Sequence, residues 1–147
     1  MNRAGGPGPR TIVFLCVANS ARSQMAEAIA RQIAPPGARV LSAGSNPWRV
    51  HPMAVRVLAE EGLDIAGARS KSVDEIPFAT ADLVVTLCAD EVCPVTPPGV
   101  RRLHWPIPDP AKAWGKEELL RRFRKTRDLL RSRIPDLFAS LEHPPSA

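Results

Sequence analysis

The sequence lacks several features, and each absence narrows the class of protein. No run approaches the roughly 18 consecutive apolar residues of a transmembrane helix, so no membrane span or membrane partner is expected. The apolar run that follows the N-terminal residues is too short and too interrupted for a secretory signal. Cysteine is scarce, and three is a poor number for a framework of structural disulfides. Catalytic or metal-binding thiols in a reducing compartment are favoured instead, so we expect a cytoplasmic protein.

Internal repeats and a second compositional block are also missing. The 147 residues suit one domain with a sizeable core, which we place at 11–147 after a flexible, Gly- and Pro-rich leader at 1–10. The net charge is +5, and much of it comes from the segment 121–133. Aromatic residues do not interleave with these basic ones, so a solvated helix face is favoured over a nucleic-acid patch. A basic surface would also attract an oxyanion or an acidic partner protein.

Apolar runs and helical periodicities alternate along the chain, which is typical of a parallel α/β sheet covered on both faces. The nearly continuous apolar run at 82–88 indicates a strand that is buried on both sides. Pro135 is expected to end the last long helix, with a fresh turn through Leu141. The predicted strands are 11–16, 39–44, 82–88 and 101–105, the predicted helices are 24–33, 51–61 and 116–133, and a short helix or turn is predicted at 70–76.

The stretch from Cys16 to Ser23 combines a strand end, a short loop and a helix start. Free N–H groups and the helix dipole at such a start favour an anion. Arg22 can add a planar fork of donors, and the same field stabilises a thiolate. Cys16 is therefore a candidate nucleophile beneath an oxyanion such as phosphate or arsenate, with Ser20 or Ser23 bonded to its sulfur. The residues predicted to bind the oxyanion are Val17, Ala18, Asn19, Ser20, Ala21, Arg22 and Ser23.

Other reactive residues follow the later strands. Ligands bind beyond the carboxyl ends of parallel strands, so Cys16, Cys88 and Asp109 are expected at one edge of the sheet. Asp109 could protonate an oxygen leaving group, or it could form a turn with Pro110. Cys88 and Cys93 could bind zinc, be inert buried thiols or exchange disulfides. Zinc is disfavoured because four suitably spaced ligands are missing, and no metal site is expected.

The string from Val13 to Ala28, VFLCVANSARSQMAEA, resembles the phosphate loop of the low-molecular-weight protein tyrosine phosphatase superfamily, and more narrowly that of the thioredoxin-coupled arsenate reductases. The resemblance extends from about Thr11 to Leu141. It implies a four-stranded parallel sheet in the order 2-1-3-4 with helices on both faces. It also implies that Asp109 is the general acid.

The arsenate reductase resemblance implies a relay of three cysteines. Cys16 would attack arsenate, Cys88 would attack the sulfur of Cys16 and release arsenite, and Cys93 would then attack Cys88 and free Cys16. Thioredoxin would reduce the resulting disulfide by thiol–disulfide exchange. Phosphate and sulfate would bind as analogues of arsenate. No cofactor is expected to bind tightly. Some of these enzymes bind a potassium ion near the loop, and Asn19, Glu27 and Ser42 match parts of that site.

Two other functions use the same loop. A protein tyrosine phosphatase would use Cys16, Arg22 and Asp109 through a phosphocysteine intermediate. That chemistry requires neither Cys88 nor Cys93. Asp109-Pro110 is followed directly by Ala111-Lys112, without the aromatic residues that flank a phosphotyrosine, so we expect only weak phosphatase activity. A non-catalytic oxyanion-binding module would bind phosphate without turnover.

Overall fold

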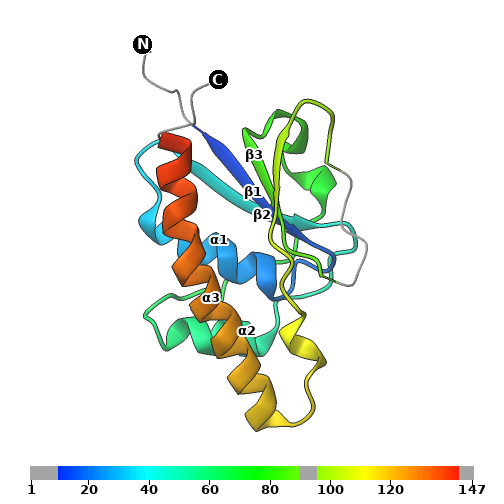
Figure 1. Cartoon of the computed structure of the whole chain (residues 1–147). Helices are drawn as coiled ribbons and strands as arrows, with labels where there is room; N and C mark the ends of the chain where they lie inside the picture. The colour runs from blue at the N-terminus through cyan, green and yellow to red at the C-terminus, as the bar shows by residue number, and fades with distance from the viewer. Residues whose placement is uncertain (1–9, 90–95, 143–147) are drawn as a thin grey trace.

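Four parallel strands form one sheet in the order β2-β1-β3-β4, as the family resemblance implied (Figure 1). The computed structural model describes residues 10–89 and 96–142. Cys16 is paired with Gly44 on one side of the central strand, and Leu15 is paired with Thr86 on the other. The strands are β1 (Thr11–Cys16), β2 (Arg39–Gly44), β3 (Leu83–Thr86) and β4 (Arg101–His104).

The central strand β1 is buried on both faces because its side chains alternate between two apolar clusters. Ile12 and Phe14 point into the larger cluster, whereas Val13 and Leu15 point into the smaller one. The larger cluster contains the buried faces of α1 (Arg22–Ile33), α2 (Pro52–Ala59) and α3 (Lys116–Glu142). The three α-helices of the described residues therefore lie on the same side of the sheet, where α1 packs directly on β1 and β2 and α2 packs mainly against α3.

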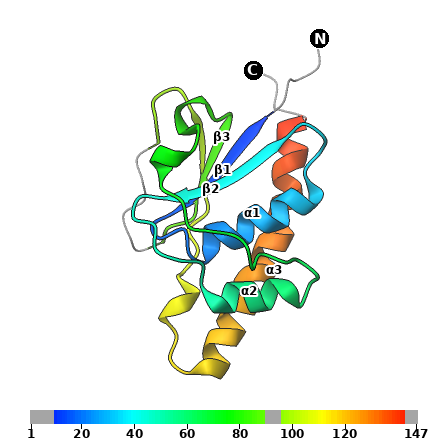
Figure 2. The same cartoon turned by 180° about the vertical axis from the view of Figure 1, so that it is seen from behind.

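Short 3-10 helices cover the opposite face. Val73 and Phe78, from η1 (Val73–Glu75) and η2 (Phe78–Thr80), pack against the smaller cluster. Figures 1 and 2 show these green segments on the side of the sheet away from the α-helices. Helices do lie on both faces as expected, but the coverage is unequal. The turn predicted at 70–76 is η1, which Ser72 and Glu75 close with a capping box.

The predicted break at Pro135 is wrong, because α3 runs through it without interruption. A proline inside a helix costs about 3 kcal/mol, since it removes one backbone hydrogen bond and crowds the preceding turn. Ile134, Leu137 and Phe138 are buried in the main core around it, and each such side chain contributes roughly 1.5–3 kcal/mol of burial. The packing therefore outweighs the local cost of proline.

Other boundaries differ by a few residues. Helix α1 begins at Arg22 rather than at residue 24, and β3 ends at Thr86, so Cys88 lies just beyond its strand. The predicted leader falls outside the described residues except for Arg10. No helix within 10–89 and 96–142 has both the length and the apolarity that a membrane crossing requires.

Candidate active site

The carboxyl ends of β1 and β3 bring distant residues to one edge of the sheet. The N–H of Leu87 donates to the carbonyl of Leu15 at 2.9 Å, and the N–H of Ile107 donates to the carbonyl of Leu87 at 3.2 Å. Cys16 and Cys88 each follow one of these bonded residues, and Asp109 lies two residues after Ile107. The predicted meeting of these three residues at one edge is therefore what the backbone pairing shows.

The N-terminus of α1 is open to an anion. Its N-cap, Ala21, has no side-chain oxygen to accept from the first turn, and that turn contains no acidic residue. The first N–H groups of a helix have no intrahelical acceptor. The positive end of the helix is thus not neutralised by its own side chains, and it faces the loop that follows Cys16.

Arg22 connects the loop to the two neighbouring segments. Only 4% of this residue is exposed, and its Nη1 donates to the carbonyl of Ile107 at 2.8 Å and more weakly to that of Leu87 at 3.4 Å. Its Nη2 lies 4.0 Å from Oδ2 of Asp109. The guanidinium is therefore fixed in the wall of the site and keeps the loop and Asp109 in register.

Cys16 is a free, buried thiol whose sulfur lies 2.9 Å from Oγ of Ser23. Of the two serines considered from the sequence, Ser23 makes this contact. Asn19, in the left-handed region at φ 49°, donates to the same Oγ at 2.7 Å. Since one lone pair of Ser23 accepts from Asn19, the hydroxyl proton is available to donate to a thiolate at Cys16.

A segment that the sequence analysis did not identify holds the outer side of the loop. The N–H groups of Asn46, Trp48 and His51 donate to the carbonyls of Val17, Ala18 and Ser20 at 2.9–3.1 Å. These bonds occupy loop carbonyls, so the loop has a defined shape before any ligand binds. The contacts use main-chain atoms and leave no pattern of side chains, so only the fold reveals them.

Gly44 is required by close packing at the end of β2. A Cβ atom at this position would lie 2.3 Å from the carbonyl oxygen of Val17 and 2.9 Å from the nitrogen of Asn19. Real Cβ atoms do not approach backbone this closely. Only glycine lets the strand pass directly against the oxyanion loop.

We expect Gly44→Ala to lower kcat/KM by about 100-fold, because a displacement of the order of 1 Å misaligns the loop with Cys16. The measurement is steady-state hydrolysis of an aryl phosphate together with thermal unfolding. Gly67→Ala is the matched control, since a Cβ at Gly67 meets nothing within 4 Å. Equal activity of the two variants would contradict the close-packing explanation.

Asp109 forms the turn that was one of its two predicted roles, and its position is compatible with the other role, that of a general acid. Its Oδ1 accepts from the N–H of Ala111 at 2.9 Å and starts η3 (Pro110–Lys112), which is the turn expected of an Asp-Pro pair. Its Oδ2 faces Arg22, and 26% of the side chain is exposed. One oxygen therefore positions the other at the mouth of the site, where a general acid is needed.

His51 is a second neighbour of Asp109 that the sequence analysis did not select. Burial lowers the pKa of His51 below its ordinary value, with Asp109 opposing the shift and Arg49 adding to it. Its Nδ1 accepts from the N–H of Met53 at 3.0 Å and caps α2. The ring therefore acts as a structural acceptor beside Asp109.

Of the other two cysteines, the structure describes Cys88 but not Cys93. Cys88 is buried and forms a disulfide, whereas Cys16 is free, so these two are not bonded to each other. Cys93 lies outside the described residues. Among the described residues, Cys88 among them, no three His, Cys, Asp or Glu side chains lie together in a group that could hold a metal ion.

The basic residues of α3 are largely paired with carboxylates. Arg121 and Arg122 contact Glu118, and Arg131 contacts Glu61. Arg124 and Arg127 both contact Glu60, and their hydrogen bonds lower the pKa of Glu60 to about 2. This pairing is typical of a solvated helix face, which is the interpretation favoured from the sequence.

Comparisons with known proteins converge on one family. Residues 11–146 match the family model of low molecular weight phosphotyrosine protein phosphatases. An arsenate reductase of Bacillus subtilis is 43% identical over 130 residues, which cover 86% of this chain and 94% of the relative. A solved arsenate reductase in a phosphate-binding state has a TM-score of 0.74 at 31% identity, covering 89% of this chain and 98% of its own. A thioredoxin-dependent arsenate reductase of Corynebacterium glutamicum has a TM-score of 0.71 at 29% identity, covering 91% of this chain and 62% of its own.

Proposed function

The chain belongs to the low molecular weight phosphotyrosine protein phosphatase family, and within it we propose that the protein is an arsenate reductase recycled by thioredoxin. The observation that carries the proposal is the position of the free Cys16 thiol, bonded to Ser23 at the N-terminus of α1 and adjacent to the strand that leads to Cys88. The relative named arsenate reductase that is 43% identical to this chain supports the same assignment.

The first step is substitution at arsenic. The Cys16 thiolate attacks arsenate held by the N–H groups of 17–23 and by Arg22. A hydroxyl group leaves as water after Asp109 supplies a proton, and a thiol–arsenate adduct remains. Fixed hydrogen-bond donors stabilise the oxyanion charge, and such stabilisation of the transition state is usually the largest single contribution to the rate in a site of this kind.

The second step is the redox step. The Cys88 thiolate attacks the sulfur of Cys16, and the sulfur–arsenic bond breaks with its electron pair left on arsenic. Pentavalent arsenic becomes trivalent, arsenite leaves, and Cys16 and Cys88 are oxidised to a disulfide.

The third step returns the enzyme to its starting state. Cys93 attacks Cys88, the Cys16 thiolate is released, and a dithiol of thioredoxin reduces the remaining disulfide. The free thiol of Cys16 and the disulfide at Cys88 support this step. A thiol relay of this kind needs a reducing compartment, so the proposal places the reaction in the cytoplasm.

Phosphate hydrolysis is the second function that the site supports. Cys16, Arg22 and Asp109 suffice for a phosphocysteine intermediate that water then hydrolyses, and the family model is that of phosphatases. The reaction requires neither Cys88 nor Cys93, so we propose it as a weak side activity.

The test is arsenite formation from arsenate with thioredoxin, its reductase and NADPH, compared with hydrolysis of an aryl phosphate by the same preparation. We expect sustained arsenite formation and slow hydrolysis, both absent in Cys16→Ser. Hydrolysis without reduction would assign the protein as a phosphatase. Phosphate binding with neither activity would assign it as a binding module.

A further inference from the structure

The residues that match the family's potassium site do not fit a resident potassium ion in this chain. Oδ1 of Asn19 already accepts from Nε2 of Gln24 at 2.8 Å and from the N–H of Lys71 at 2.9 Å. Oγ of Ser42 donates to Glu27 at 2.6 Å and accepts from Asn19 at 2.9 Å. The oxygens that a cation would require are therefore engaged with hydrogen-bond partners.

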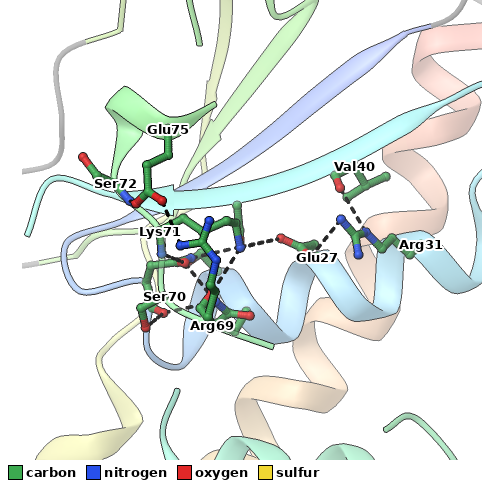
Figure 3. Close-up of polar contacts among 12 residues, drawn as sticks. Glu27, Arg31, Val40, Arg69, Ser70, Lys71, Ser72 and Glu75 are labelled. Atoms are coloured by element: carbon green, nitrogen blue, oxygen red, sulfur yellow. Dashed lines mark hydrogen bonds and ion pairs between the residues drawn. The ribbon is translucent and has the colours of Figure 1, made fainter. Parts of the chain in front are cut away.

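A lysine supplies a positive charge at this place instead. Nζ of Lys71 lies 3.6 Å from Oε1 of Glu27 and 3.2 Å from the carbonyl of Arg69, and Figure 3 shows it reaching Glu27 from the segment 69–72. Arg31 contacts the other oxygen of Glu27 at 3.2 Å. Since the side chains of Lys71 and Glu27 are only 17% and 9% exposed, these charges are weakly screened, and a third cation would be repelled.

We propose that the Lys71 ammonium is a built-in substitute for a monovalent cation, and that it positions the oxyanion loop without any need for potassium. Lys71 is a positioning residue, because it touches Glu27 and not the oxyanion. The proposal concerns oxyanion binding, and it holds whether the bound anion is reduced, hydrolysed or only held.

The effect of Lys71 reaches Cys16 through one chain of hydrogen bonds. An ionised Glu27 can only accept, so the proton of Ser42 points to it and the lone pairs of Ser42 accept from Asn19. Asn19 uses its other amide proton on Ser23, and Ser23 then donates to the Cys16 sulfur. Lys71 and Arg31 hold the Glu27 carboxylate in place from its two oxygens, and the position of this carboxylate orients every bond in the chain.

The main chain delivers the ammonium to its place. The N–H of Gly44 donates to the carbonyl of Lys71 at 2.9 Å, so the lysine is fastened to the end of β2. Ser70 donates through its Oγ to the carbonyl of Asn19 at 2.7 Å, which ties the same segment to the oxyanion loop. Because the backbone is held on both sides, little freedom is lost when the side chain settles on Glu27.

The experiment measures the dissociation constant of inorganic phosphate by calorimetry in choline chloride and in potassium chloride at equal ionic strength, because salt screens all charges alike. We expect the unaltered protein to bind phosphate equally in both salts. Lys71→Gln should bind at least about fivefold more weakly in choline chloride, from the loss of one charged contact. Potassium should restore its affinity, because the variant removes the ammonium from Oε1 of Glu27 and from the carbonyl of Arg69 and leaves these two oxygens open to a cation.

Arg69→Gln is the matched control, since it removes a positive charge from the same segment but from a residue that contacts exposed Glu75. It should behave like the unaltered protein in both salts, as should Lys71→Arg, which keeps a cation. The proposal is overturned if potassium strengthens phosphate binding by the unaltered protein, a measurement that decides even if Lys71→Gln does not fold. It is equally overturned if Lys71→Gln binds normally in choline chloride, or if its loss is the same in both salts.

Discussion

Replacing Cys88 by Ser abolishes arsenite formation while aryl phosphate hydrolysis persists; this is the largest effect that we expect. Serine has nearly the shape of cysteine, so the buried site at 88 should fold around it, but a hydroxyl cannot attack the sulfur of Cys16 and take it into a disulfide. The sulfur–arsenic bond then stays intact, and arsenic is not reduced. Water can still attack a phosphocysteine at Cys16.

A single-turnover assay separates the roles of the other sulfurs. Reduced enzyme is mixed with arsenate in the absence of thioredoxin, and arsenite is counted per enzyme. We expect a single equivalent from the unaltered protein and from Cys93→Ser, but none from Cys88→Ser or Cys16→Ser. With thioredoxin present, only the unaltered protein should continue. Arsenite released by Cys88→Ser would mean that another reductant reaches the adduct, and the three-cysteine relay would be wrong.

The part of this site that the sequence predicts is the part encoded locally. Cys16 and Arg22 lie on one strand–loop–helix unit, so their spacing and the flanking patterns reveal the anion site before any tertiary contact is known. Asp109 and Cys88 could be placed only through the general rule for parallel sheets, because each follows a different strand. For Cys88 the rule succeeded because the strand before it, β3, has a clear apolar signal, whereas β4, the strand before Asp109, is largely exposed and has only a weak one.

The missed features are those that depend on long-range backbone contacts. Gly44 has an ordinary appearance in the sequence, yet its strand passes against Val17 with no room for a side chain. Lys71 lies in an irregular segment with no periodicity, and only the folded chain brings it to Glu27. Pro135 misled for the opposite reason, since a strong local signal was outweighed by burial of the surrounding residues.

Arg22→Lys tests whether the geometry of the guanidinium or only its charge is needed. Lysine keeps the positive charge but has no planar fork, so it cannot donate to the carbonyl of Ile107 and at the same time direct donors toward a tetrahedral oxyanion. We expect kcat/KM for both arsenate reduction and aryl phosphate hydrolysis to fall by about 100- to 1,000-fold, as for removal of one preorganised oxyanion donor.

Both reactions should decline together, because the loop and Arg22 act before the two paths separate. Arg39→Lys is the matched control: it makes the same chemical change on an exposed residue at the amino end of β2, far along the strand from Gly44 and the site. Steady-state kinetics and phosphate binding are measured for both variants. If Arg22→Lys retained full activity in both reactions, charge alone would suffice, and the hydrogen bonds that hold Arg22 between the oxyanion loop and Ile107 would have no catalytic value.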